Sequence, residues 1–400
     1  MASVEVLVTP SPFANLAPLY EVDLDADALL IVPTSNQPFA PWEDPYQVNG
    51  INGAHKKTTH AAAPASRPGL RIKVSSKHLA LASRVFRNKL QFGSTKATRQ
   101  ADGRVHLKLA EGFDPKAVSI VVNAVHSRGS QVPKAVDLET LAQIAVVVDR
   151  LQLLDAVDVY ADRWISKLEG RIQDIYNRDL VLWIYISHVF RRSDIFKAVS
   201  KTAAAQAQGP IQTLNLPIRE KIINHIDTER QSLLSRTIST LHQTLDDLTT
   251  TTSPCTAHHC DSLLLGELVK ALAKQKLLWP QPAKPYAGVS FAALVKSVGA
   301  AVSVHRQTQR REEGDGWFLK GVNGVGVAKE GGTPGWGVVG GLFPLTPVTS
   351  PRLGFGGGGF RSGGHGCDVD AVVARLNGLG ALREGVEGLA LESELGYQLY

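Results

Sequence analysis

Within residues 70–168 the apolar residues follow two different spacings in turn, and this change of period restricts the chain to a fold that mixes strands and helices. Leu70–Val74 and Arg104–Leu109 alternate apolar and polar residues, and a period of two predicts short strands. An acidic turn leading into an apolar run predicts a further strand within Glu21–Pro33. Because helical patterns separate these strands, we expect the α+β class, with a few short strands and a cluster of helices.

Helix-start signals separate the helices of this stretch. One helix is predicted from Ser76, with an apolar stripe of Leu79, Ala82, Phe86 and Leu90. Asp114-Pro115, Asp137 and Asp155 each precede a run with helical spacing; Asp is a favoured N-cap residue, and Pro suits the first helical turn. The inward residues of these three helices are predicted to be Val118, Val121, Val122 and Val125; Leu138, Leu141, Ile144, Val148 and Leu151; and Val157, Tyr160, Ala161, Trp164 and Leu168.

Helical spacing continues through the rest of the chain, apart from one Gly-rich tract. Helices are predicted over 166–208 and 217–248, from Asp261, from Ser290 and after Cys367-Asp368. Residues 314–364 hold 18 of the 36 glycines, and such a tract loses much conformational entropy on ordering and offers few side chains to bury. Its GVNGVGVAK segment lacks the Gly-Lys-Ser/Thr of a phosphate-binding loop, so a flexible insertion is the preferred interpretation.

These patterns predict a division of the chain into five parts. We expect disorder over 1–17, an α+β domain over 18–170 with a loop insertion at 34–69, a helical domain over 171–304, a Gly-rich disordered insertion over 305–364, and a C-terminal helix within 365–400 that packs on the helical domain.

The amino-acid sequences of three segments resemble the BTB/POZ domain. They are VSSKHLALASRVF (74–86), VHLKLAEGFDPKAVSIVVNAVHSRG (105–129) and VDLETLAQIAVVVDRLQLLDAVDVYADRWI (136–165). In that family a strand pair leads into a helix of the form H-x-x-L-x-x-x-S-x-x-F, here His78, Leu79 or Leu81, Ser83 and Phe86, and an Asp-Pro helix and a helical hairpin follow. The resemblance implies a compact domain that pairs with itself or with other proteins through helices.

The whole chain resembles a group of fungal proteins that carry a BTB/POZ domain near the N-terminus, followed by a helical region. The similar segments are WIYISHVF (183–190), CTAHHCDSLLLGEL (255–268), HGC (365–367) and VEGLAL (386–391). There are departures: His126-Ser127-Arg128-Gly129 stands where many BTB domains have an aromatic turn, and neither a kelch repeat nor a C2H2 finger follows.

A Cys/His set forms a candidate zinc site. Cys255 and Cys260 have the spacing of a zinc ligand pair, and His365 with Cys367 would supply the other two ligands, because thiolate and imidazole suit tetrahedral zinc. His258 and His259 are alternative ligands. Buried small Cys side chains and solvated His rings are the competing interpretation, which leaves the chain without a cofactor.

Charge and Cys content indicate the compartment and the partners. With three Cys in 400 residues we expect a reducing compartment, cytoplasmic or nuclear, and no apolar run is long enough for a membrane span. The net charge is +6, and residues 71–108 carry ten Lys/Arg and one Asp. A solvated helix face is the preferred interpretation of this basic stretch, and nucleic-acid binding is the alternative.

The sequence favours a non-enzymatic protein. No G-x-S-x-G elbow occurs, and His78 and His126 lie in apolar helix patterns, where a structural His is expected. We therefore expect a scaffold, adaptor or regulator that binds other proteins, or itself as a homodimer, through apolar helix ridges. The alternatives are a nucleic-acid-associated transcriptional regulator using the basic face of residues 71–108, and a substrate adaptor of a cullin-type ubiquitin ligase.

Overall fold

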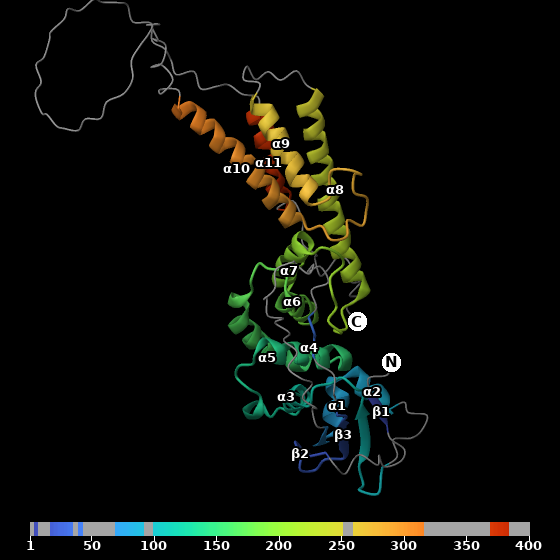
Figure 1. Cartoon of the computed structure of the whole chain (residues 1–400). Helices are drawn as coiled ribbons and strands as arrows, with labels where there is room; N and C mark the ends of the chain where they lie inside the picture. Colours follow the sequence, from blue (N-terminus) through green and yellow to red (C-terminus); the bar gives the residue numbers. More distant parts are fainter. Residues whose placement is uncertain are drawn as a thin grey trace, which may run out of the picture.

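The protein is an elongated α+β molecule in a computed structural model of the whole chain, with a small sheet at one end and a group of long helices at the other (Figure 1). The structure describes residues 4–6, 17–34, 39–42, 69–91, 99–250, 259–315 and 369–383. The expected mixed class is confirmed.

A five-stranded sheet forms the N-terminal end, in the order β1-β5-β3-β4-β2. Its strands are β1 (Val4–Val6), β2 (Leu19–Glu21), β3 (Ala28–Val32), β4 (Leu70–Val74) and β5 (Val105–Leu109). The central strand β3 runs antiparallel to β4 and parallel to β5. The predicted strands at 70–74 and 104–109 are confirmed.

Strand β1 corrects the expectation of disorder over 1–17. Val4–Val6 pair antiparallel with β5, with Val4 opposite Leu109. Val4 is buried in the core of the sheet, so the burial of an apolar side chain stabilises a strand that three residues would not form alone.

The single helix predicted from Ser76 is two helices, α1 (Ser76–Ala82) and α2 (Arg84–Gln91). Ser83 between them has extended backbone, at φ −135° and ψ 125°. Its buried hydroxyl donates to Leu151 O (2.5 Å) and accepts from the Phe86 N–H (3.1 Å). At this break the Ser83 hydroxyl provides a hydrogen-bond donor for the carbonyl at the end of a distant helix. The local sequence pattern gives no sign of this contact.

Three helices complete the N-terminal unit: α3 (Pro115–Val125), α4 (Leu138–Leu151) and α5 (Leu154–Leu168). Asp114 caps α3 through the Ala117 N–H and Asp137 caps α4 through the Thr140 N–H, as predicted. The predicted cap at Asp155 is wrong, because α5 starts at Leu154 and its N-cap is Leu153, two residues before Asp155. Leu153 is buried and donates its N–H to Val148 O, so the turn between α4 and α5 is tighter than the sequence indicates.

The predicted continuous helix over 166–208 is also wrong. The chain forms α6 (Arg178–Val189) and α7 (Ser193–Gln206), with Asn177 capping α6 through the Leu180 N–H. Every residue from Leu180 to Val189 is buried, which is typical of a helix surrounded by protein on all sides. The short connection before α7 turns at Arg191, whose φ is +54°.

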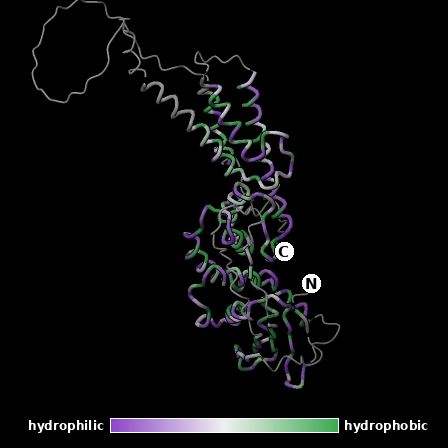
Figure 2. The backbone as a smooth tube through the Cα atoms, in the orientation of Figure 1, coloured by the Kyte–Doolittle hydropathy of each residue, from purple (hydrophilic) through white to green (hydrophobic). Residues whose placement is uncertain are grey.

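The C-terminal end contains α8 (Glu220–Thr250), α9 (His259–Lys274), α10 (Phe291–Asp315) and α11 (Val369–Gly378), and the 3-10 turn Leu379–Arg383 follows α11. They enclose a second apolar core, whose buried members include Leu234, Leu268, Leu294 and Val373. Figure 2 shows hydrophilic and hydrophobic residues alternating along α8 and α9, as expected for amphipathic helices. Because α10 continues to Asp315, residues 305–315 of the expected Gly-rich insertion are helical.

Candidate functional site

Most of the candidate zinc ligands lie outside the residues that the structure describes, so the structure does not test the zinc site. Cys255, His365 and Cys367 lie outside them, as does His258. Cys260 lies in the first turn of α9, and its side chain is outside the described part. Among the described side chains there is no group of three or more His, Cys, Asp or Glu residues that could hold a metal ion. The zinc site stays a prediction.

Some basic residues of 71–108 lie on the strands of the sheet and others on α1 and α2. This corrects their interpretation as one solvated helix face. Arg71, Lys73 and Lys108 lie on the outer face of the sheet, opposite or beside Leu29 and Ile31 of β3. Leu29 and Ile31 are buried apart from the main core. The neighbouring long side chains can cover them with their aliphatic stems while the charged ends remain near solvent.

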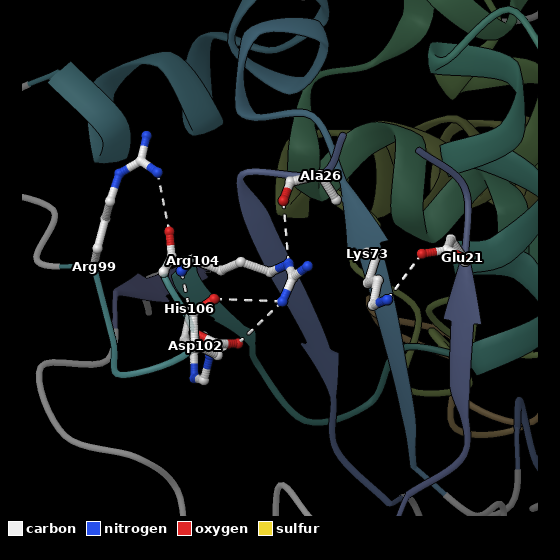
Figure 3. A network of polar contacts seen from close by, with 8 residues as sticks. Glu21, Ala26, Lys73, Arg99, Asp102, Arg104 and His106 are labelled. Atoms are coloured by element: carbon white, nitrogen blue, oxygen red, sulfur yellow. Dashed lines mark hydrogen bonds and ion pairs between the residues drawn. The ribbon is translucent and has the colours of Figure 1, made fainter. Parts of the chain in front are cut away.

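Among the described residues of this stretch, five cations have partners within the chain, and three of them, Lys73, Arg99 and Arg104, are drawn in Figure 3. Lys73 pairs with Glu21 (2.8 Å), and Arg104 donates to Ala26 O (3.1 Å). The remaining three, Arg71, Arg87 and Arg99, donate to the backbone oxygens of Ala17, of Ala80 and Leu81, and of Gly103. Four of these cations join strands and turns of the sheet, and Arg87 joins α2 to α1, so much of the basic character serves the fold.

Asp102 is the acidic centre of the same network. Burial alone would raise the pKa of Asp102, but the hydrogen bond with His106 (3.1 Å), the Arg104 N–H and the nearby positive charges outweigh it, and the pKa is lowered. An ionised Asp102 next to Arg104 and His106 neutralises part of the sheet face. This arrangement weakens the nucleic-acid alternative, because phosphate contacts need uncompensated charge.

The two candidate histidines differ in role. His126 receives the Ser75 N–H at Nε2 (3.0 Å), and its Nδ1 lies 2.9 Å from Val122 O, which requires the neutral ring with the proton on Nδ1. Burial lowers the pKa of His126, and the neighbouring His78 ring, 5.0 Å away, lowers it further. His126 therefore fastens the start of α1 to the end of α3. His78 is exposed, contrary to its predicted place in an apolar pattern.

A cavity of about 440 Å³ lies where the start of α4, the end of α5 and the start of α6 meet. Its lining is Val136, Asp137, Leu138, Leu168, Arg171, Ile172, Gln173, Asn177, Asp179, Leu180 and Trp183. This lining contains no Ser, Cys, Lys or His, and its charged residues are Asp137, Arg171 and Asp179. The side chains of Asp137 and Asn177 are engaged in helix capping, so these two lining residues have a structural role.

The apolar stripes that the helical spacing predicts to face inward are covered within the chain itself, as expected. Phe86, Val118, Ile144 and Trp164 are each buried, as are most of the inward residues that the periods predict. Within the described residues, the large apolar side chains that are exposed are Leu19, Leu24, Leu81, Val159, Ile175 and Trp279.

Leu81 is distinctive among these residues because of its neighbours. Its side chain is 79% exposed on α1, where Lys77 and His78 are exposed too, and Arg84, the first residue of α2, is also exposed. We call these four residues the α1 surface. The sequence does contain a signal for it, since Leu81 falls outside the predicted stripe of Leu79, Ala82 and Phe86.

The comparisons with known proteins add no relative. No family model matches the chain, and no curated protein or solved structure matches it either. Within the described part, none of the helices is both long and apolar enough to cross a bilayer.

Proposed function

We propose that the chain is a non-enzymatic protein-interaction protein whose N-terminal unit, residues 18–170, acts as a BTB/POZ-like domain. The observation that carries the proposal is the arrangement of that unit. The β3–β4 pair leads into α1 and α2, β5 returns parallel to β3, and the Asp-Pro helix α3 and the hairpin α4–α5 follow. This is the layout that the resemblance of segments 74–86, 105–129 and 136–165 implies.

The proposed binding region is the α1 surface, and the proposed partner is a second copy of the same domain or another protein. Leu81 is a largely exposed apolar side chain, and the exposed Lys77, His78 and Arg84 lie three or four positions from it along the chain. Such a centre with a polar rim is the usual anatomy of a small protein interface. A function as scaffold, adaptor or regulator follows from this proposal, and a cullin-type ubiquitin ligase is one partner to look for.

Size-exclusion chromatography with light scattering tests the proposal, together with recovery of bound proteins from an extract. Leu81→Asp should abolish self-association or partner retention, because a charge would replace the apolar centre. Val159→Asp is a matched control, since Val159 on α5 is also 79% exposed. Equal behaviour of the two variants and the unmodified protein would remove the α1 surface from consideration.

The salt dependence of binding separates the proposal from nucleic-acid recognition. Binding through an apolar centre should change little between low and high salt, whereas phosphate contacts give a steep decrease in affinity. A steep decrease for a DNA or RNA duplex, with affinity lost in Lys77→Gln, would favour the nucleic-acid alternative.

A further inference from the structure

A groove of about 500 Å³ lies on α8, far from the N-terminal sheet, and the sequence analysis did not indicate it. Its lining is Thr228, Gln231, Ser232, Ser235 and Arg236 from α8, and Lys284 from the loop before α10. None of these six residues is acidic or apolar. We call it the α8 groove.

The α8 groove follows from the amphipathic pattern of α8. Thr228, Ser232 and Ser235 are spaced by four and three residues, so they lie on one face of the helix. Leu233 and Leu234 lie on the opposite side and are buried in the second core. The hydroxyl-bearing face is therefore fixed toward the outside by the packing of α8.

A buried arginine holds Lys284 beside this face. Arg230 is 0% exposed and donates to Pro285 O (2.7 Å) and Tyr286 O (3.3 Å). Asp227 neutralises its charge at 2.8 Å. The carbonyl groups next to Lys284 are thus attached to α8, and the groove is formed before any ligand arrives.

The groove offers hydrogen-bond donors and positive charge that its surroundings do not use. Among the described residues, Arg236 and Lys284 have no acidic partner, and the hydroxyl groups of Ser232 and Ser235 make no hydrogen bond. Of the nearby acids on α8, Asp227 is engaged by Arg230 and by Gln231 (2.6 Å), and Glu229 is not part of the lining. Uncompensated donors of this kind attract an anion.

We propose that the α8 groove binds a phosphorylated serine or threonine of a partner polypeptide. A phosphate monoester carries close to two negative charges and three acceptor oxygens, which matches two cations and two free hydroxyl groups. A single carboxylate would leave part of this donor set unused.

A polypeptide is favoured over a small phosphate compound by Trp279, whose side chain is 79% exposed. Its ring lies 6.3 Å from the ring of His242 in an edge-to-face arrangement. His242 is on α8, closer to the C-terminal end of the helix than Arg236. His242 is six helical positions after Arg236, a rise of about 9 Å along the axis, which is the length of about three residues of extended chain. A peptide could place its phosphate in the groove and an apolar side chain against Trp279.

The test uses the full chain and two degenerate peptide libraries, one with a fixed phosphoserine and one with serine at that position. The phosphoserine library should be retained at least about tenfold more strongly, since charged hydrogen bonds contribute on that scale. The double variant Arg236→Gln/Lys284→Gln should lose this preference. The matched control Lys274→Gln/Lys296→Gln removes the same charge from α9 and α10 and should keep it.

Three outcomes would overturn the proposal: equal retention of the two libraries, the same preference in the groove variant, or inorganic phosphate binding as tightly as the phosphoserine peptides. The last result would indicate a small-anion site. All four substituted cations are exposed, so melting temperatures should not change. The proposal does not rest on the α1 surface, and Leu81→Asp should bind the phosphoserine library normally.

Discussion

The guanidinium of Arg178 lies 3.0 Å from the carboxylate of Glu139 and joins the first residue of α6 to the first turn of α4. The same group donates to Ala40 O (2.8 Å) and Phe39 O (3.2 Å). Trp42, next to this segment, packs edge-on against Tyr176 at 5.6 Å. One side chain therefore joins the N-terminal unit, residues 39–42 and the central helices.

Arg178→Ala should lower the free energy of unfolding by about 2–3 kcal/mol, because two backbone carbonyls and a carboxylate lose a charged donor. Arg178→Lys should recover only part of this loss, since an ammonium group cannot reproduce the planar fork. Urea unfolding followed by circular dichroism measures both. As a control, Glu139→Gln should cost less than about 1 kcal/mol, because the carboxylate is half exposed. An Arg178→Ala protein as stable as the unmodified one would show that this contact is dispensable.

Local rules predict much of the fold and fail where distant parts of the chain meet. The caps at Asp114 and Asp137 were correct because an N-cap bonds within its own helix. The break at Ser83 was missed because its partner is Leu151, and Arg178 had no visible role because its partners include residues 39 and 40. Burial of the apolar stripes followed from periodicity, whereas Leu81 and the α8 groove depend on which residues are left uncovered.

Ser83→Ala should cost about 1–3 kcal/mol, although it removes a single oxygen atom. The substitution leaves Leu151 O and the Phe86 N–H without their partner in a buried position. Thermal unfolding measures the effect. Ser303→Ala on α10 is a suitable control, since the Ser303 hydroxyl is exposed and bonds only to Gly299 O of its own helix, and it should change stability by less than about 0.5 kcal/mol. Similar melting temperatures for the two variants would contradict the bridging role of Ser83.

Arg230→Met should release the loop that carries Lys284. The variant removes the guanidinium that holds Pro285 O and Tyr286 O and leaves Asp227 without its buried partner, a loss of about 3 kcal/mol. Hydrogen exchange should show faster exchange over 283–289 than in the unmodified protein. Arg236→Met removes an exposed cation from the same helix and should leave exchange there unchanged. Unchanged protection in Arg230→Met would place the anchor of the loop elsewhere.

The buried His188 should make stability depend on pH. Burial, with a smaller effect of the Arg219 charge, lowers its pKa from 6.5 to about 4. Its Nε2 atom has no hydrogen-bond partner, and Phe196 packs beside the ring. The unfolded chain therefore binds a proton at higher pH than the folded chain does. The contribution of His188 to the free energy of unfolding is fully present above pH 6.5. It decreases by about 3 kcal/mol as the pH falls toward about 4.

His188→Gln isolates this contribution, because the side chain remains polar but does not titrate. Other groups change with pH as well; burial raises the pKa of Asp149, which acts in the opposite direction at lower pH. These contributions are common to both proteins, so the difference in unfolding free energy between them should change steadily between pH 6.5 and 4 and be constant above that interval. Urea titrations at a series of pH values measure the difference. A difference that does not vary with pH would mean that His188 takes up its proton equally in the folded and unfolded chain, and the burial of its ring would then have no consequence for acid stability.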